Sequence, residues 1–319
     1  MAKTRVDETR DCVDLTNLDQ PLFEGAGATK RDHIDYLDGI ADRIVPVLRD
    51  RPLSVIRTTR GQAPFMQKNL PDYTPEWVAR VSVWAEASHR DVSYALCNDR
   101  RTLLWFGNQR AVEFHPALAL AERLDHITHL VLDLDPPGDA FSAAVAVAKL
   151  VREALAGVGL SGAVKTSGAK GLHVFVPIAA TTSAHDAAAA TRALAERTAQ
   201  LDPAIATTAF LKEDRGGKVF VDATRTGGAT VVAAYSPRAR PDVPVSFPVG
   251  WDDLDEISPR DFTIKHAVAQ LGGRDPWADA MPPDQELPHD LLAEGHEIPI
   301  PRVAAMHEGK RRKAKQGET

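Results

Sequence analysis

One short apolar run that carries two aspartates constrains this chain most. Residues 129–137 read HLVLDLDPP. An apolar run that stops at a proline pair predicts a buried strand with a sharp end. Side chains alternate between the faces of a strand, so Asp133 and Asp135 should share one face while the leucines turn into the core. Two neighbouring buried carboxylates repel each other, which favours a bound divalent cation such as Mg²⁺ or Mn²⁺.

A purely structural role is the alternative for this aspartate pair. An Asp-x-Asp sequence at the end of a strand is common, and it often only caps the following helix. Here Asp139 follows Gly138 and is the better candidate to cap a helix expected over residues 139–156. That assignment leaves Asp133 and Asp135 available for a metal.

The composition excludes several classes of protein. The 319 residues are 44% hydrophobic and 26% charged, as in a globular chain with one large domain or two modest ones. Cys12 and Cys97 do not have metal-site spacing, so neither a disulfide framework nor a zinc site is expected and a reducing cytoplasm fits. No apolar run approaches 18 residues, so no membrane span is expected. The net charge of −6 confines nucleic-acid binding to a local basic patch.

Periodicity and composition predict the order of the elements. Residues 1–25 are expected to be a loose arm. A helix is predicted over 30–49 with Thr29 as its N-cap, and another begins at Thr182 or Ser183 and ends near residue 200. Strand-like runs are short, and they lie at 53–57, 81–84, 102–106 and 111–116. Residues 279–319 are expected to be a Pro-rich linker and a basic tail, partly disordered.

A turn of small residues is the second candidate for chemistry. Residues 164–176 read VKTSGAKGLHVFV, and Gly168 allows the backbone to approach a ligand closely. Ser167, Lys170 and His173 offer donors, which together with backbone amides suit a phosphate. The order of residues is not that of a P-loop, and the turn leads into a strand. A tight hairpin with an incidental lysine explains the pattern equally well.

A later strand brings a third aspartate. Residues 218–222 read KVFVD and end at Asp222. If this strand neighbours the first, three carboxylates can hold two cations for in-line phosphoryl transfer. Arg238 and Arg240 follow, framed by prolines; on an extended segment they would share a face and could clamp phosphates.

The remaining candidates are single side chains with structural alternatives. Phe65 and Lys68 lie in a Pro-bounded loop and could stack a base and hold a phosphate, but a buried Phe beside a surface Lys fits equally. Lys30 and Arg31 open a helix and form either an anion site or a solvated pair. His115, in the run AVEFHP, would usually be structural.

These motifs, in this order, resemble the archaeo-eukaryotic primase superfamily. They are more similar to the polymerase domain of the bacterial ATP-dependent ligase D and its stand-alone mycobacterial relatives, the Prim-PolC-like primase-polymerases. The resemblance covers about residues 21–278. Its motifs are GATK at 27–30, QKNLP at 67–71, EFHP at 113–116, LDLDP at 132–136, SGAKGLH at 167–173 and KVFVD at 218–222.

The resemblance implies an α+β fold. It consists of a primase-polymerase core, at about 126–278, with a central mixed or antiparallel sheet flanked by helices. A smaller N-terminal α/β subdomain is expected at about 26–125. No ligase or nuclease region follows, so a free-standing enzyme is expected.

The resemblance also implies residue roles. Asp133, Asp135 and Asp222 match catalytic metal ligands for two Mn²⁺ or Mg²⁺ ions. The residues that match nucleotide contacts are His115, Ser167, Gly168, Lys170, His173, Arg238 and Arg240. Lys30 and Lys68 match lysines that grip a 5′-phosphate, and Phe65 matches an aromatic residue at the template.

The implied activity is template-directed nucleotide transfer that fills short gaps or ends in DNA during excision repair or end joining. The implied partners are gapped or broken DNA with a 5′-phosphate, ribo- and deoxyribonucleoside triphosphates, an ATP-dependent ligase acting in trans, and Ku. A cytoplasmic, nucleoid-associated location fits, without a membrane. Two alternatives stay open: a non-catalytic protein that bridges DNA ends for a ligase, and a primase that starts chains de novo.

Overall fold

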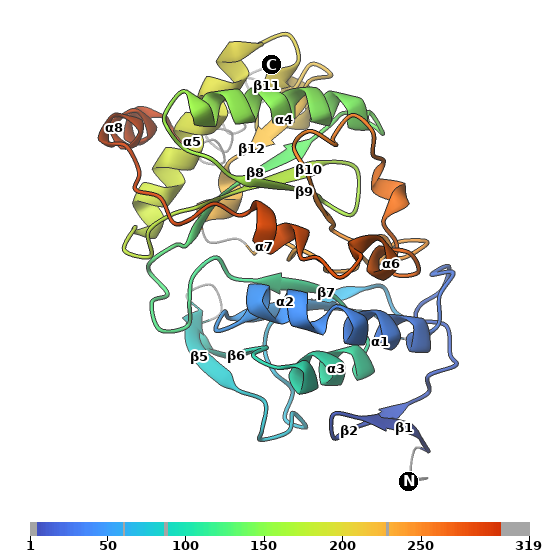
Figure 1. The fold of residues 1–319 in the computed structure, drawn as a ribbon. Helices are drawn as coiled ribbons and strands as arrows, with labels where there is room; N and C mark the ends of the chain where they lie inside the picture. The colour runs from blue at the N-terminus through green and yellow to red at the C-terminus, as the bar shows by residue number, and fades with distance from the viewer. Residues whose placement is uncertain (1–4, 60, 86–88, 228–229, 301–319) are drawn as a thin grey trace, which may run out of the picture.

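Two large β-sheets, each with its own helices, and one two-stranded hairpin make up the described part of the chain (Figure 1). The structure is a computed structural model that describes residues 5–59, 61–85, 89–227 and 230–300. One sheet has six strands in the order β11-β12-β8-β10-β9-β13, and the other has five. The predicted α+β class is confirmed. The predicted division near residue 125 stays a prediction.

The six-stranded sheet is the larger layer. Every pairing in it is antiparallel except that of β11 with β12. Its strands are β8 (His129–Asp135), β9 (Ala163–Thr166), β10 (Leu172–Pro177), β11 (Ala206–Thr207), β12 (Val219–Asp222) and β13 (Pro248–Val249). Helices α4 (Phe141–Ala156) and α5 (Ala184–Leu201) contact each other and β8, and they cover one face of this sheet (Figure 1). The leucines of β8 are fully buried, as predicted.

The five-stranded sheet lies nearer the N-terminus. In it, β3 pairs with β4, β6 and β7. Its strands are β3 (Leu53–Arg57), β4 (Phe65–Gln67), β5 (Arg80–Ala85), β6 (Arg90–Ala95) and β7 (Ala111–Pro116). The helices of this half are α1 (Lys30–Gly39), α2 (Ala41–Leu48) and α3 (Arg100–Asn108). The predicted strands near 53–57, 81–84 and 111–116 are therefore confirmed.

The helix predicted over 30–49 is wrong as a single element. Thr29 caps α1 as predicted, and its side chain accepts a hydrogen bond from the Asp32 N–H in a reciprocal capping box. The chain leaves helical geometry at Ile40, where φ is −108° and ψ is 5°, and α2 then begins. Gly39, a weak helix former, ends α1.

The strand predicted over 102–106 is also wrong, because these residues lie in α3. The Asp99 side chain caps this helix by accepting a hydrogen bond from the Thr102 N–H at 2.7 Å. In a short apolar run, the spacing of the apolar residues does not distinguish a strand from a buried helix. Asp99, a typical N-cap residue, was the feature of the sequence that indicated a helix.

The N-terminal segment is not a loose arm in its described part. Strands β1 (Val6–Arg10) and β2 (Val13–Thr16) form a hairpin. Leu15, Leu18 and Leu22 are fully buried. These leucines lie in the same apolar core as α1, so the segment is folded onto the N-terminal half.

The segment expected to be a linker is partly helical. It contains α8 (His289–Glu297), which packs on α5, and it begins within the last residues of α7 (Pro276–Ala280) (Figure 1). Proline and acidic residues suggested a linker, but Leu291 of α8 is fully buried. The predicted basic tail at 310–315 lies outside the described residues. The remaining short elements are α6 (Ala267–Leu271), η1 (Lys212–Asp214), η2 (Thr224–Gly227) and η3 (Pro259–Asp261).

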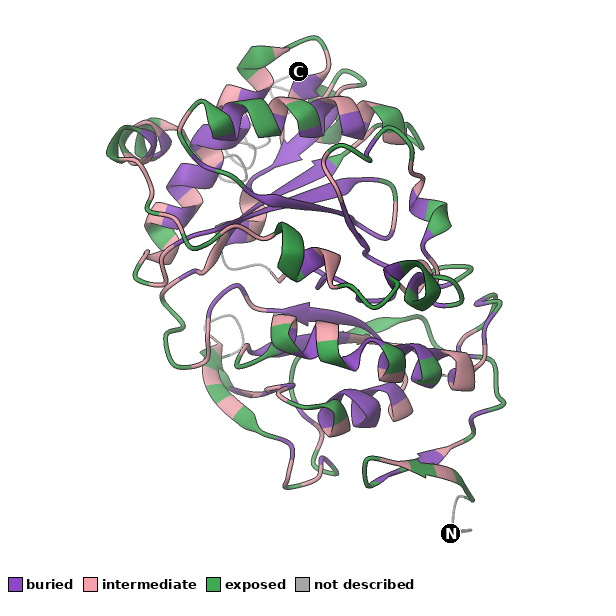
Figure 2. Ribbon diagram, in the orientation of Figure 1, coloured by how far each residue is buried: buried purple, intermediate pink, exposed green. Residues whose placement is uncertain are grey.

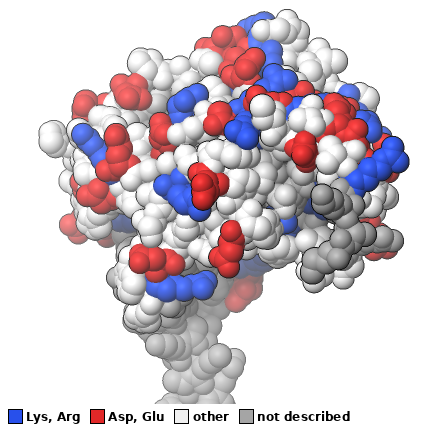
Figure 3. All heavy atoms as spheres, turned by 90° about the horizontal axis from the view of Figure 1, so that it is seen from below, with Lys and Arg blue, Asp and Glu red and all other residues white. Residues whose placement is uncertain are grey.

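The strands of the two large sheets differ in how far they are buried (Figure 2). The strands at the centre of the six-stranded sheet are buried along almost their whole length, whereas β5 alternates between exposed and half-buried residues. Figure 3 shows one face of the molecule, on which basic and acidic side chains are mixed. Within the described ranges, no helix has both the length and the apolar character needed to cross a bilayer.

Gly295 provides a test of how α8 docks. A Cβ atom at Gly295 would lie 2.0 Å from the Ala189 carbonyl oxygen of α5. We therefore expect Gly295→Ala to push α8 off α5 and to lower the free energy of unfolding by about 1–3 kcal/mol. Urea unfolding measures this change. Gly157→Ala is the matched control, because its Cβ would meet backbone oxygens at an ordinary 3.5 Å; equal stability of the two variants would contradict the expected close approach.

Candidate active site

A row of polar side chains runs across four neighbouring strands of the six-stranded sheet. Asp222 on β12 is directly opposite Asp133 on β8, and Asp133 is in turn opposite His173 on β10. His173 is opposite Lys165 on β9. We call these four residues the polar row. The strand bearing Asp222 thus neighbours the strand bearing Asp133, which is the condition for a cluster of three carboxylates.

Hydrogen bonds connect most of the polar row. His173 Nε2 lies 3.3 Å from Asp133 Oδ1, and Lys165 Nζ lies 2.8 Å from His173 Nδ1. Lys165 Nζ also donates to Ser246 Oγ at 2.5 Å. Burial, with the charge of Lys165, lowers the pKa of His173 to about 4, so the imidazole is neutral. Donation from Lys165 to Nδ1 leaves the ring proton on Nε2, where it faces Asp133.

Lys165 is an unusual member of the row because its side chain is fully buried. Burial, and then the nearby charge of Arg238, hold its pKa well below the usual range. Its two hydrogen bonds satisfy most of its donors in this buried position. Lys165 therefore fixes the orientation of His173.

Three carboxylates gather at one end of the row. Asp133 and Asp135 lie on the same face of β8, and Asp222 lies beside Asp133. Burial raises the pKa of Asp135, and the charges of Asp133 and Asp222 raise it further. For Asp133, the effect of burial is outweighed by His173 and Arg225, so its pKa is lowered.

Arg225 lies against two of these carboxylates. Its Nε is 3.1 Å from Asp133 Oδ2 and 3.5 Å from Asp222 Oδ2. The guanidinium offsets part of the negative charge, but Asp135 keeps a raised pKa beside it. Three hard oxygen donors with this excess of negative charge fit Mg²⁺ or Mn²⁺. The residues present therefore suit the predicted metal.

The small-residue turn connects β9 to β10, so it leads into a strand as predicted. Ser167 Oγ accepts hydrogen bonds from the N–H groups of Ala169 and Gly171, both at 3.2 Å. A Cβ at Gly171 would lie 1.9 Å from the carbonyl oxygen of Leu134, so the turn packs directly against β8. Gly168 has a φ of +66°, which favours glycine. This packing holds the turn beside the aspartates.

Lys170 extends from this turn to Asp139, with Nζ and Oδ1 2.8 Å apart. The predicted role of Asp139 as a helix cap is wrong: α4 begins after Ala140 without a side-chain cap. Both side chains of the pair are more than half exposed, at 53% and 76%. An exposed pair of this kind adds little stability, so Lys170 can exchange Asp139 for another anion at low cost.

Glu113 joins the two halves of the molecule at the site. Its Oε2 lies 2.9 Å from His115 Nε2 and 3.0 Å from Arg238 Nε, and its Oε1 accepts the Ala239 N–H at 2.9 Å. Arg238 also donates to the Ser167 carbonyl oxygen. Burial opposes ionisation of Glu113, but these partners outweigh it and lower the pKa to about 2. Burial lowers the pKa of His115.

The two arginines do not share a face, so that expectation is wrong. The segment bends, and the Arg240 N–H donates to the Arg238 carbonyl oxygen at 2.8 Å. Arg238 is held by Glu113, whereas Arg240 is exposed. Their roles toward a nucleotide stay predictions.

The predicted DNA contacts divide into buried and exposed side chains. Lys30 Nζ donates to the Thr16 carbonyl oxygen and to Asn108 Oδ1, both at 2.6 Å, and burial lowers its pKa to about 8. The prediction of Lys30 as a phosphate contact is corrected here, because its ammonium faces the interior. Phe65 and Lys68 are exposed, on β4 and directly after it.

Four residues of the site were missed from the sequence. They are Glu113, Lys165, Arg225 and Ser246. Glu113 had a usable signal, because it lies two residues before His115 on the same strand and so shares its face. Lys165 lies on β9, one residue before the strand ends at Thr166 and the predicted turn begins. Arg225 and Ser246 lie outside regular strands, and only the fold brings them to the row.

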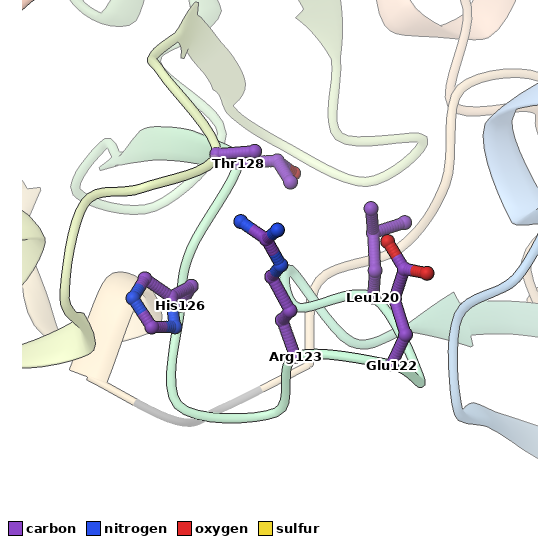
Figure 4. Close-up of a pocket in the computed structure, with 6 residues that line it drawn as sticks. Leu120, Glu122, Arg123, His126 and Thr128 are labelled. Atoms are coloured by element: carbon purple, nitrogen blue, oxygen red, sulfur yellow. The ribbon is translucent and has the colours of Figure 1, made fainter.

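A pocket of about 220 Å³ lies elsewhere (Figure 4). Its lining comes mainly from the connection that precedes β8, and it consists of Leu120, Glu122, Arg123, His126, Thr128 and Ala180. Thr128 precedes β8, whereas Asp135 ends it. The pocket therefore contains none of the predicted site residues.

The lowered pKa of Glu113 predicts a pH dependence of stability. In the folded state, this carboxylate stays ionised at pH values below its ordinary pKa of 4.5. Its contribution to the free energy of unfolding is therefore complete above pH 4.5 and is lost as the pH falls toward 2. Glu113→Gln should flatten the decline in the free energy of unfolding between pH 4.5 and the acid transition. Urea unfolding at several pH values measures it. The exposed Glu153→Gln is the control; identical slopes in both variants would contradict the assignment.

Comparisons with known proteins agree with this geometry. A family model described as "LigD, primase-polymerase domain" matches residues 29–277. The chain is 33% identical over 273 residues to the multifunctional non-homologous end joining DNA repair protein LigD of Mycobacterium tuberculosis, covering 81% of this chain and 35% of that protein. It is 32% identical over 266 residues to the bifunctional non-homologous end joining protein LigD of Bacillus subtilis, covering 81% of this chain and 42% of that protein.

A solved structure matches most of the fold. The polymerase domain from Mycobacterium tuberculosis ligase D, in complex with DNA, superposes with a TM-score of 0.76 at 30% identity, covering 85% of this chain and 99% of that chain. The chain thus spans well under half the length of the curated relatives, but nearly all of this domain. It belongs to the LigD primase-polymerase domain family.

Proposed function

We propose that this protein is a template-directed, metal-dependent nucleotidyltransferase that fills short gaps or ends in DNA during repair. One observation carries the proposal: in a member of this family, three aspartates lie beside a tightly packed turn that contains Ser167 and Lys170. A protein that only bridges DNA ends has no need for carboxylates facing DNA phosphates. The expected substrates are gapped or broken DNA with a 5′-phosphate and ribo- or deoxyribonucleoside triphosphates.

The aspartates are the proposed holders of two Mn²⁺ or Mg²⁺ ions. When bound, such ions lower the pKa of the primer 3′-hydroxyl and offset charge on the transferring phosphate. The chain itself keeps the carboxylates in place. His173 donates to Asp133, and Lys165 holds His173 from behind. The polar row thereby orients Asp133 before any substrate arrives.

The turn at 167–171 is the proposed binding site of the triphosphate. The N–H groups of Ala169 and Gly171 close the turn on Ser167 Oγ. The Ser167 hydroxyl and the Lys170 ammonium can donate to phosphate oxygens. Lys170 can leave the exposed Asp139 for a phosphate. Glu113 holds Arg238 beside the turn and fixes His115. Placement of this kind supplies most of the catalysis in phosphoryl transfer.

The DNA is proposed to meet the exposed end of the five-stranded sheet. Phe65 is 39% exposed on β4 and can stack against a template base. Lys68 follows on an exposed loop and can bind a 5′-phosphate. An ATP-dependent ligase acting in trans, and Ku, are the proposed partners that complete the repair.

Primer extension tests the function directly. A labelled primer is extended across a short gap with a downstream 5′-phosphate, in Mn²⁺, with each class of nucleotide in turn. We expect extension by the wild type, and a loss of about 100-fold or more in Asp133→Asn/Asp135→Asn, because the carboxylates hold the ions. The surface variant Asp42→Asn controls for loss of negative charge and should extend normally.

The outcomes separate three functions. DNA binding without extension in any metal or nucleotide would contradict the proposal and favour an end-bridging protein. Synthesis on a template without any primer would favour a primase. DNA binding by the double variant, measured by fluorescence anisotropy, shows whether it is folded and still meets DNA.

Arg225 makes a prediction about metal affinity that does not depend on activity. Its guanidinium lies within 3.5 Å of two ligand carboxylates, so it opposes a divalent cation. We expect Arg225→Gln to bind Mn²⁺ more tightly than the wild type, by about tenfold, as measured by the electron paramagnetic resonance signal of free Mn²⁺.

The control is Arg152→Gln, a surface arginine that pairs with Asp252 on the helical side of the sheet. It should leave Mn²⁺ affinity unchanged. Weaker binding by Arg225→Gln would contradict the prediction and would mean that Arg225 orients the carboxylates for the metal.

A further inference from the structure

Three side chains suited to a transition metal gather where α5 begins and α8 ends. His185 and Asp186 lie in the first turn of α5, and His296 lies in the last turn of α8. One ligand atom from each falls within 4.8 Å of the others. His296 Nε2 is 2.9 Å from Asp186 Oδ1, and His185 Nδ1 is 4.0 Å from the same oxygen. The two imidazole rings stack, with centroids 4.6 Å apart and planes at 27°.

We propose that His185, Asp186 and His296 form a binding site for a transition-metal cation such as Zn²⁺, which fastens α8 to α5. Two imidazole nitrogens and one carboxylate oxygen are a donor set that Zn²⁺ accepts, with solvent completing a tetrahedron. Donor atoms about 2.0–2.2 Å from such an ion lie about 3.3 Å from one another. The two separations from Asp186, of 2.9 and 4.0 Å, differ from this spacing by under about 1 Å. All three ligand atoms lie within 4.8 Å of one another, so side-chain rotations can bring the two imidazole nitrogens to the same spacing.

The backbone holds these ligands close together. A Cβ at Gly295 would lie 2.0 Å from the Ala189 carbonyl oxygen, so α8 touches α5 directly beside His296. Arg192 donates to the Gly295 carbonyl oxygen at 2.9 Å, and Arg197 pairs with Glu294 at 2.5 Å. The arrangement of α5 and α8 is visible in Figure 1. His296 is thus placed by helix packing and not by its own rotamer alone.

Ser183 fixes the position of the Asp186 carboxylate. Its Oδ2 accepts a hydrogen bond from the Ser183 hydroxyl at 2.8 Å, and its backbone N–H donates to Ser183 Oγ at 3.0 Å. This bonding leaves Oδ1 directed at the two imidazoles. The loss of side-chain freedom on metal binding is correspondingly small.

This site lies apart from the aspartates of the polar row. The end of β10 that leads toward α5, at Pro177, pairs with His129, and Asp135 is at the other end of β8. The donors also differ, because nitrogen ligands favour Zn²⁺ and carboxylates alone favour Mg²⁺ or Mn²⁺. The inference therefore stands independently of the proposed polymerase activity.

Zinc titration of the full chain tests the site. The protein is first freed of metal with a chelator, and calorimetry then measures Zn²⁺ binding in excess Mg²⁺, which occupies the carboxylate site. We expect one Zn²⁺ per chain in the wild type and at least about tenfold weaker binding in His185→Gln/His296→Gln. His289→Gln, an exposed histidine at the start of α8, is the matched control and should bind like the wild type.

Two further readouts decide the result. Co²⁺ in place of Zn²⁺ should give the strong visible absorption of a four-coordinate ion in the wild type and in His289→Gln, but not in the double variant. Zn²⁺ should also raise the melting temperature of the wild type and of His289→Gln, but not that of the double variant. Equal Zn²⁺ affinity in the wild type and the double variant, or no binding by either, would overturn the proposal.

Discussion

The hydrogen bonds from Lys165 to His173 and from His173 to Asp133 are the contacts on which the site depends. They exist only if β8, β9 and β10 pair in one register, since a slip of one residue would turn each side chain to the opposite face. The leucines of β8 secure that register from the other face, where α4 and α5 cover them. Core packing and the polar row thus specify the same alignment.

Burying so many charged groups is costly, and the fold offsets the cost by pairing them. Asp133 has His173 and Arg225, and Glu113 has His115 and Arg238. Asp135, at the exposed end of β8, is the exception, because partial desolvation and two neighbouring carboxylates raise its pKa. A divalent cation would neutralise the negative charge around Asp135 more completely than one side chain can. The raised pKa of this carboxylate therefore indicates where an ion would bind.

The sequence was most informative where local pattern and chemistry coincide. The strands of Asp133 and Asp222, the Ser167 turn and the Thr29 cap all followed from alternation, glycine placement and capping residues. Roles were harder to predict than elements. Lys30 stood at the start of a helix as predicted, but the N-terminal hairpin supplies acceptors that bury its ammonium. Contacts made between distant segments, such as Lys165 with Ser246, leave no local trace in a sequence.

The contact between Lys165 and Ser246 has a consequence for how the protein is made. The side chains of the site come from β7, β8, β9, β10, β12 and the segment before β13, so their contacts span much of the chain. Contacts this distant form late, after the ribosome has released most of the domain. A chain that ended soon after Asp222 would contain all three aspartates and Lys165, but it would lack Ser246, the second hydrogen-bond partner of the Lys165 ammonium. In such a chain Lys165 would have one partner fewer to hold it against His173.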